Sequence, residues 1–213
     1  MFSDRVDAGK RLASTLKDYA GGDAIVLAIP RGGVIVGYEV AHKLRLHLDI
    51  IVPRKIGAPQ NPELAIGAVT EDGTIMLDHR LVEYLGVPKS YIEEECDRQR
   101  LEITRRLKLY RGDIPYPNLK GRVVIIVDDG IATGATIKAA LASIRKKDPK
   151  SIVIATPVAP PSTIKELKRD ADRVVCISIP EHFFAIGQFY RDFPQNSDEE
   201  VKRLLQLNRE EHE

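Results

Sequence analysis

The chain of 213 residues is long enough for one hydrophobic core of ordinary domain size. Its 32 Lys and Arg residues nearly balance 31 Asp and Glu residues, so the formal net charge of +1 provides no overall field that would attract nucleic acid or a membrane surface. No apolar run approaches the ~20 residues of a membrane span, and no signal-peptide core follows Met1, so we expect a cytoplasmic protein.

The first part of the chain predicts a helix, a strand and a second helix. Ser3 or Asp4 is suited to cap the first helix, and the continuous apolar run 24–29 predicts a buried strand. The turn Pro30-Arg31-Gly32-Gly33 follows, and a helix over 34–44 comes directly after it. Two glycines let a backbone approach an anion closely, and an arginine adds a forked cation. The turn is therefore a candidate anion site, with a plain strand-to-helix connection as the alternative.

A second apolar run, 48–52, predicts another strand, and it ends in Pro53 followed by Arg54 and Lys55. Two cations at a strand end suit an anionic ligand, although they also occur as ordinary surface charge. The next segment, 56–63, contains glycine and prolines and has no periodicity. We expect it to be a loop that is mobile in the free protein and closes over bound ligand as a lid.

The middle of the chain is expected to form a hairpin and two helices. The hairpin spans 64–77 around an Asp-Gly turn, and a short helix over 79–85 precedes a long one over 88–111. The long helix has one apolar stripe and is interpreted as a cover on the sheet, with a dimer face as the alternative. Cys96 and Cys176 lie far apart in apolar patterns, which favours buried thiols over a disulfide or a metal site.

The most specific pattern is R-V-V-I-I-V-D-D-G-I-A-T-G-A-T, from Arg122 to Thr136. The run 123–127 predicts a strand buried on both faces, and Asp128 and Asp129 follow at its carboxyl end, where open α/β sheets bind ligands. Small residues then lead into a helix over 137–146, whose N-terminus favours an anion. A ligand with both a phosphate and sugar hydroxyls or Mg²⁺ fits this combination. The alternative is an ordinary strand-turn-helix with two surface acids.

The remaining elements continue the alternation. Strands are expected over 151–155 and 173–179, with a short helix over 161–168 between them. Alternating strands and helices predict a parallel sheet with right-handed crossovers in a single core domain. The sequence contains neither G-x-x-x-x-G-K-[ST] nor G-x-G-x-x-G, which excludes a P-loop and a dinucleotide-binding fingerprint.

The segment 180–193 is unusually aromatic for a chain with only 6% aromatic residues. It contains Phe183, Phe184, Phe189, Tyr190 and Phe193. Such side chains stack well on nucleobases, and the alternative is a small satellite core over the sheet edge. After it, Ser197 is suited to cap a terminal helix, and the tail from Asn208 onward is expected to be frayed.

The motif D-D-G-I-A-T-G-A-T resembles the phosphoribosyl-pyrophosphate motif of type I phosphoribosyltransferases. The resemblance covers most of 24–179. It implies an α/β fold with a parallel sheet, flanking helices, a flexible loop or β-ribbon, and a small hood. We accordingly expect one phosphoribosyltransferase domain over 1–213, with a core of about 24–179 and a hood built from 1–20 and 180–213.

The resemblance also implies a function. The expected reaction transfers the 5-phosphoribosyl group from phosphoribosyl pyrophosphate to a nitrogenous base, a purine or pyrimidine, and releases pyrophosphate with Mg²⁺ as cofactor. This pentosyl transfer would belong to nucleotide salvage and nucleoside metabolism. The expected partners are phosphoribosyl pyrophosphate, a nucleobase-like acceptor and a second copy in a homodimer, without nucleic acid or membrane. The alternative is a regulatory protein that binds phosphoribosyl pyrophosphate without turnover, although no helix-turn-helix or basic footprint is evident.

The family's pattern assigns roles to particular positions. The two adjacent acids, Asp128 and Asp129, would bind ribose hydroxyls or Mg²⁺, directly or through water. The 5′-phosphate would lie against the backbone of Ala132, Thr133, Gly134, Ala135 and Thr136. Pyrophosphate would be bound by Arg31, Gly32 and Gly33, in a loop that often contains a cis peptide in the family.

The family's pattern also indicates candidate catalytic groups and a residue that would stack on the base. Arg54 and Lys55, which match the R-K of adenine-type members, would stabilise the departing pyrophosphate. Glu63 is a candidate general acid by position alone, and Phe184 is the candidate for stacking on the base. The base itself stays open, because Ala132 stands where 6-oxopurine members have an Asp, whereas the aromatic segment is similar to theirs.

Overall fold

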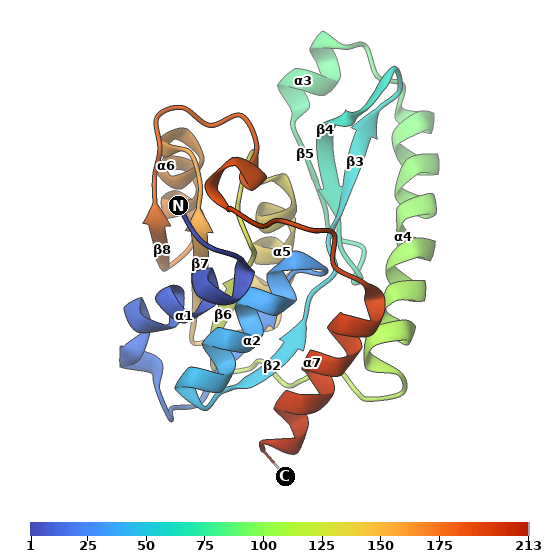
Figure 1. The fold of residues 1–213 in the computed structure, drawn as a ribbon. Helices are drawn as coiled ribbons and strands as arrows, with labels where there is room; N and C mark the ends of the chain where they lie inside the picture. Colours follow the sequence, from blue (N-terminus) through green and yellow to red (C-terminus); the bar gives the residue numbers. More distant parts are fainter. Residues whose placement is uncertain (213) are drawn as a thin grey trace.

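The computed structural model describes residues 1–212, which form a central parallel sheet and a smaller antiparallel one (Figure 1). The parallel sheet has five strands in the order β2-β1-β6-β7-β8. Their bounds are β1 Ala24–Ala28, β2 His47–Ile50, β6 Val123–Val127, β7 Ser151–Val158 and β8 Arg173–Ser178. Each neighbouring pair is parallel, as the alternation of strands and helices predicted.

Helices cover both faces of this sheet. The helices are α1 Arg5–Thr15, α2 Gly32–Leu44, α3 His79–Tyr84, α4 Lys89–Arg111, α5 Ala135–Arg145, α6 Pro161–Asp170 and α7 Asp198–Glu210. Two short 3₁₀ turns lie at Lys17–Tyr19 and Ile186–Phe189. Helices α1, α2 and α7 contribute to the apolar core on one face, and α5 and α6 contribute to the core on the other.

The middle strands supply both cores because their side chains alternate between the faces. In β1, Val26 belongs to the core under α1 and α2, whereas its neighbour Leu27 belongs to the core under α5. In β6, Ile125 and Ile126 divide in the same way. A strand buried on both faces needs apolar residues at every position, which is why these two strands are continuous apolar runs.

The smaller sheet is a ribbon of β3 Arg54–Ala58, β4 Asn61–Val69 and β5 Ile75–Leu77, paired antiparallel. Together with α3 and α4, this ribbon stands beside the parallel sheet (Figure 1). The hairpin predicted over 64–77 is confirmed as β4 and β5. The expectation of an irregular loop over 56–63 is wrong, because most of these residues belong to β3 and β4.

Strand β3 and the first residues of β4 were missed because this part of the ribbon is irregular. The pairing register shifts on both sides of Gly57, where a Cβ atom would lie 2.5 Å from the carbonyl oxygen of Pro62. A bulge of this kind hides the alternation that normally reveals a strand, and proline in a strand is tolerated there. Ile56 is fully buried in the core, and the Tyr91 hydroxyl donates to the Gly57 carbonyl over 3.0 Å. Both contacts fix β3 to the body of the protein.

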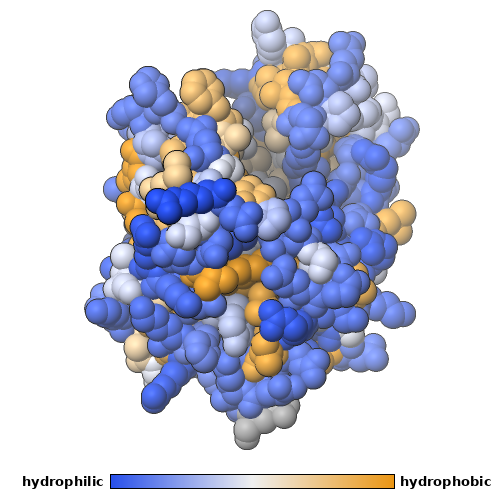
Figure 2. All heavy atoms as spheres, in the orientation of Figure 1, coloured by the Kyte–Doolittle hydropathy of each residue, from blue (hydrophilic) through white to orange (hydrophobic). Residues whose placement is uncertain are grey.

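The long helix α4 begins and ends as predicted, but it covers the ribbon and α7 rather than the parallel sheet. Its apolar stripe, including Ile92 and Ile103, is buried there, while Leu101 on its outer side is 75% exposed. No helix within residues 1–212 combines the length and the apolar character needed to cross a membrane. Figure 2 shows a surface on which hydrophilic residues predominate.

The C-terminal helix also differs from expectation. Asn208 was expected to lie in a frayed tail, but it is buried. Its side chain accepts a hydrogen bond from the Leu48 amide over 2.6 Å and donates to the Leu46 carbonyl over 3.1 Å. Leu48 in the edge strand β2 and Leu46 directly before it present these backbone groups, and α7 satisfies them from 160 or more residues away along the chain. Cys96 is buried, Cys176 is partly buried, and both are free thiols.

Candidate active site at the carboxyl edge of the sheet

Two turns meet at the carboxyl edge of the parallel sheet. Strands β1 and β6 are neighbours with Ala28 opposite Val127, so the turns that follow them lie side by side. A Cβ atom on Gly33 would lie 3.0 Å from the Asp128 Cα, and one on Gly32 would lie 1.9 Å from the Asp129 Oδ2. Position 32 therefore has no room for a side chain, and one at position 33 would fit only if the neighbouring backbone shifted by a few tenths of an ångström.

The structure thus brings the predicted pyrophosphate loop against the predicted ribose-binding acids. The peptide bond between Pro30 and Arg31 is cis, as the resemblance indicated. The Arg31 guanidinium lies 3.8 Å from the Asp198 carboxylate, at the start of α7, and its side chain is 38% exposed. Arg31 is therefore weakly tethered and remains accessible at the sheet edge.

The two acids have different environments. Asp129 is buried, and Asp128 is half-buried, with its carboxyl group enclosed by the protein. The Asp129 amide donates to the Asp128 Oδ1 over 2.9 Å. Burial, and then the negative charge of Asp129, raise the pKa of the Asp128 carboxyl well above its usual range. The two carboxyl groups therefore form one acidic centre rather than two independent surface carboxylates.

A third residue joins this centre that the sequence did not reveal. The Nε atom of Arg5, in the first turn of α1, donates to the Asp129 Oδ2 over 2.6 Å. Its NH1 group donates to the Pro194 carbonyl over 2.8 Å, and its guanidinium lies 3.7 Å over the Phe193 ring. The ion pair spans 124 residues of sequence, so no local pattern could have indicated it.

The loop before α5 has the geometry of an anion cradle. Gly134 has φ of +77°, a left-handed conformation that glycine adopts without strain, and α5 begins at the next residue. The amides of a helix's first turn have no partner within the helix, so the amides following Ala132 are available to an anion. The Thr163 hydroxyl of α6 donates to the Ala132 carbonyl over 2.6 Å and holds the loop from behind.

A cavity of about 300 Å³ opens beside this cradle. Its wall consists of Thr133, Ala135, Lys138 and Glu166 on the core side and Ala65, Gly67, Met76, Leu77 and Asp78 on the ribbon side. Figure 2 shows the surface hollowed between the core and the ribbon. Lys138 and Glu166 form an ion pair at the rim. The cavity provides room for a ligand directly against the predicted phosphate loop.

Three expected catalytic side chains lie elsewhere in this conformation. Arg54 Nε donates to the Gln99 side chain on α4 over 2.9 Å, and Lys55 Nζ donates to the Glu63 carboxylate over 2.8 Å. Within residues 1–212, no hydrogen bond or ion pair joins these three side chains to the acids or the anion cradle. The hydrogen bond from Lys55 lowers the pKa of Glu63, which opposes a role as proton donor at neutral pH while this pair is intact.

The aromatic segment divides into two parts. Phe183, Phe189, Tyr190 and Phe193 pack with Phe2 in a satellite core, as the structural alternative proposed. The Tyr190 hydroxyl donates to the Asp129 carbonyl over 2.5 Å, which fixes this cluster to the acid pair. Phe184 stays outside the cluster and is 90% exposed. Of the five aromatic residues in the segment, Phe184 is therefore the one most available for stacking on a ligand.

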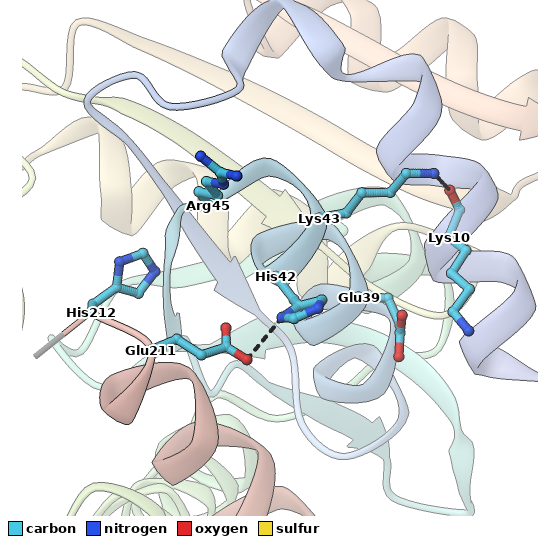
Figure 3. Close-up of a pocket in the computed structure, with 7 residues that line it drawn as sticks. All are labelled: Lys10, Glu39, His42, Lys43, Arg45, Glu211 and His212. Carbon is cyan, nitrogen blue, oxygen red and sulfur yellow. Dashed lines mark hydrogen bonds and ion pairs between the residues drawn. The ribbon is translucent and has the colours of Figure 1, made fainter.

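A larger cavity, of about 760 Å³, lies between α1, α2 and the end of α7 (Figure 3). Ionisable side chains line it: Lys10, Glu39, His42, Lys43, Arg45, Glu211 and His212. His42 Nδ1 lies 2.8 Å from the Glu211 carboxylate. This cavity lies at the C-terminal end of α2, whereas the acid pair lies at that helix's N-terminus, so the two are separate. Residues 1–212 contain no group of three or more His, Cys, Asp or Glu side chains suited to hold a metal ion.

Comparisons with known proteins agree with the motif. The family model of the phosphoribosyl transferase domain matches residues 3–194. Two Mycobacterium tuberculosis proteins, from strains CDC 1551 and H37Rv and each named a putative phosphoribosyl transferase, are 42% identical to this chain over 205 residues. These matches cover 96% of this chain and 46% of each relative, so the chain spans about half the length of those relatives.

A solved structure is similar over nearly the whole chain. The crystal structure of TT1426 from Thermus thermophilus has a TM-score of 0.80 and 43% sequence identity. The match covers 96% of this chain and 97% of TT1426. The match over residues 3–194 and the structural similarity show that the chain belongs to the phosphoribosyl transferase family, with the type I fold that its motif indicated.

Proposed function

We propose that this protein transfers the 5-phosphoribosyl group of phosphoribosyl pyrophosphate to a nitrogen of a nucleobase-like acceptor. One observation carries the proposal: the acid pair, the glycine loop and the anion cradle lie together at one edge of the sheet. A sugar with a 5′-phosphate and a pyrophosphate presents hydroxyls between two anionic groups. The order acids, cradle and second anion loop is complementary to that ligand.

The reaction breaks the bond between C1 of ribose and a pyrophosphate oxygen and forms a bond between C1 and the acceptor nitrogen. Positive charge develops on the sugar while pyrophosphate departs with negative charge. Backbone amides at the start of α2, next to Gly32 and Gly33, would hold that negative charge together with Arg31. The amides from Ala132 to Thr136 would hold the 5′-phosphate and keep the sugar in place.

Mg²⁺ fits the residues present. Mg²⁺ is usually bound by one or two carboxylates together with phosphate oxygens of the substrate and water, so it needs no cage of protein ligands. The half-buried Asp128 offers a carboxylate at the edge where such a ligand would lie. Bound there, the ion would neutralise charge on the pyrophosphate. Arg54 and Lys55 would add charge at the leaving group only after the ribbon moves toward the acids.

The acceptor base is proposed only as a class. Exposed Phe184 offers a face for stacking, whereas Ala132 provides no side chain that could exchange a proton with a purine. We further propose a homodimer and a cytoplasmic location, as expected from the sequence; the exposed Leu101 on α4 is an apolar side chain that a second copy could cover. We do not propose nucleic acid or a membrane as a partner, since the net charge is only +1.

A second candidate function is the binding of phosphoribosyl pyrophosphate without turnover. The observation that favours it is the position of Arg54, Lys55 and Glu63, which are paired with α4 or with one another rather than directed at the acids. Without these groups the site retains its binding elements but lacks the cations expected at the leaving group.

Pyrophosphate release distinguishes the two functions. The protein is mixed with phosphoribosyl pyrophosphate, Mg²⁺ and single bases from a panel, while calorimetry measures binding in parallel. We expect release of pyrophosphate with one class of base, and loss of release in Asp128→Asn. Tight binding without release for any base would favour the regulatory function, and absence of binding would refute both.

A further inference from the structure

Arg5, on the N-terminal helix α1, forms an ion pair with Asp129 of the acid pair. Its side chain is only 9% exposed and makes three contacts at once, with Asp129, the Pro194 carbonyl and the Phe193 ring. The ion pair with Asp129 is short, at 2.6 Å, and the Asp129 side chain is 12% exposed. A buried, hydrogen-bonded ion pair of this kind has one strongly preferred geometry.

Three polar atoms of Asp129 are therefore committed inside the protein. Its Oδ2 accepts from Arg5, its carbonyl accepts from Tyr190 over 2.5 Å, and its amide donates to the Asp128 Oδ1 over 2.9 Å. The Oδ2 atom also fills the space above Gly32. Within residues 1–212, one carboxylate oxygen of each acid, Asp128 Oδ2 and Asp129 Oδ1, accepts no hydrogen bond, but Asp128 has no cationic partner and is less buried as a residue than Asp129.

We propose that the two acids have separate tasks and that Arg5 is the positioning residue that separates them. Arg5 locks Asp129, the locked Asp129 amide holds Asp128 in a fixed orientation, and Asp128 is the carboxylate that contacts the ribose hydroxyls. This inference rests on the proposed function, and it narrows the expectation that both acids touch the ligand. It also explains why the N-terminal helix packs against the acid pair.

Charge supports the same assignment. Phosphoribosyl pyrophosphate carries several negative charges, and two adjacent carboxylates would repel it. Arg5 cancels the charge of Asp129 within the protein and leaves the Asp128 side chain for the hydroxyls. Without Arg5, Asp129 would be a buried carboxylate without a cationic partner, which is strongly unfavourable, so it would turn toward solvent or toward the ligand. Either movement would release the amide that holds Asp128.

A double-mutant cycle tests the inference through binding of phosphoribosyl pyrophosphate with Mg²⁺, measured by calorimetry. We expect Arg5→Met and Asp129→Asn each to weaken binding roughly tenfold or more, the range for losing a charged hydrogen bond. The double variant should bind phosphoribosyl pyrophosphate no more weakly than the single variant of lower affinity, since both changes break the same Arg5–Asp129 ion pair. Arg5→Lys should retain most of the wild-type affinity, because it keeps a cation beside Asp129. Asp128→Asn should weaken binding more than any other single variant.

The matched control is Arg11→Met, on the same helix, because Arg11 pairs with Asp7 and makes no contact with the acids. It should bind like the wild type. A crystal structure with bound phosphoribosyl pyrophosphate provides a readout that does not depend on a variant folding. There, Asp128 should lie within hydrogen-bond distance of a ribose hydroxyl while the Arg5–Asp129 pair stays intact.

Three results would overturn the inference. Losses from Arg5→Met and Asp129→Asn that add fully in the double variant would show that Arg5 does not act through Asp129. A complex in which Asp129 leaves Arg5 and binds the ribose would show that both acids are ligands. If the wild type binds no phosphoribosyl pyrophosphate at all, the proposed function itself is wrong, and that result is distinguishable from the other two.

Discussion

The hydroxyl of Thr163 on α6 donates a hydrogen bond of 2.6 Å to the carbonyl oxygen of Ala132, in the loop that precedes α5. The bond links two elements that are 31 residues apart and fixes the loop in which the anion cradle begins. The methyl group of the same threonine lies 3.1 Å from where a Cβ atom on Gly134 would be. One buried side chain thus supports the cradle and limits which residues it can contain.

Thr163→Val tests this support. Valine keeps the shape of threonine but leaves the Ala132 carbonyl without its donor, so we expect a loss of about 1–3 kcal/mol in the free energy of unfolding. Affinity for phosphate or phosphoribosyl pyrophosphate should fall as well, because the loop loses its fixed position. Urea unfolding and calorimetry measure the two effects. Ser162→Ala, at the exposed neighbouring position, is the control and should change neither.

Gly134→Val should abolish binding of phosphate at the cradle. The residue has φ of +77°, and a β-branched side chain there would also collide with Thr163. The backbone strain alone costs roughly 1–2 kcal/mol. Gly121→Val is a matched control, since Gly121 has φ of +73° but no atom within 4 Å of its Cβ position.

Both glycine variants should therefore lose similar stability from strain, but only Gly134→Val should lose the anion. Isothermal titration with inorganic phosphate measures the difference. A crystal of the wild type grown in sulfate should show an anion at the amides that follow Ala132. Equal phosphate affinity in the two variants would contradict the role of this loop.

The sequence predicted those parts of the site that are local in the chain. The continuous apolar strands, the turn at Gly32 and Gly33, and the acids before a small-residue loop each have their signal within a short stretch of neighbouring residues. The parallel sheet then brings the turns together, because adjacent parallel strands end at the same edge. The predicted neighbourhood of glycine loop and acids followed from topology and did not need any knowledge of side-chain contacts.

Long-range contacts could not be predicted in this way. Arg5 and Asn208 are single polar residues at the chain ends, and their partners lie more than a hundred positions away. Nothing in the adjacent sequence distinguishes them from surface residues. Strand β3 was missed for a different reason, since the bulge at Gly57 breaks the alternation that indicates a strand. The roles of Arg54, Lys55 and Glu63 stay predictions that depend on movement of that ribbon.

Stability should fall as pH rises from about 4.5 to 7 because of Glu71. Burial raises the pKa of Glu71 to about 7, against the opposing charges of Arg111 and Lys147, and its Oε2 has no hydrogen-bond partner. The folded state then binds a proton that the unfolded state has lost, so stability is full below pH 4.5 and declines through pH 7. The total loss is up to about 3 kcal/mol, because a pKa difference of one between the folded and unfolded states corresponds to about 1.4 kcal/mol.

Glu71→Gln should remove this slope and make the protein more stable than the wild type at pH 8. Chemical unfolding at a series of pH values measures it. Glu102→Gln is the control with the opposite sign, since hydrogen bonds from Arg105 and Arg106 lower the pKa of Glu102 to about 2. The pH dependence of stability in Glu102→Gln should differ from that of the wild type only below about pH 4.5. A wild-type stability that is constant between pH 4.5 and 7 would show that Glu71 is not enclosed.

The ribbon should resist trypsin in the free protein. Cleavage after Lys55 requires several residues to enter the protease in extended form, yet Ile56 is fully buried and β3 is paired with β4. We therefore expect slow cleavage at Lys55 both in buffer and with Mg²⁺ and phosphoribosyl pyrophosphate. Cleavage after Lys120, exposed in the irregular segment before β6, should be faster and serves as the internal control.

A variant makes this experiment sensitive to the ribbon itself. Tyr91→Phe removes the 3.0 Å hydrogen bond to the Gly57 carbonyl, so it should accelerate cleavage at Lys55 without changing cleavage at Lys120. If the wild type is instead cut rapidly at Lys55 in buffer and protected by the ligand, residues 56–63 open as an independent loop. The ribbon would then close over the site by ordering its strands, and Arg54 and Lys55 would reach the pyrophosphate through local folding rather than through movement of a rigid hairpin.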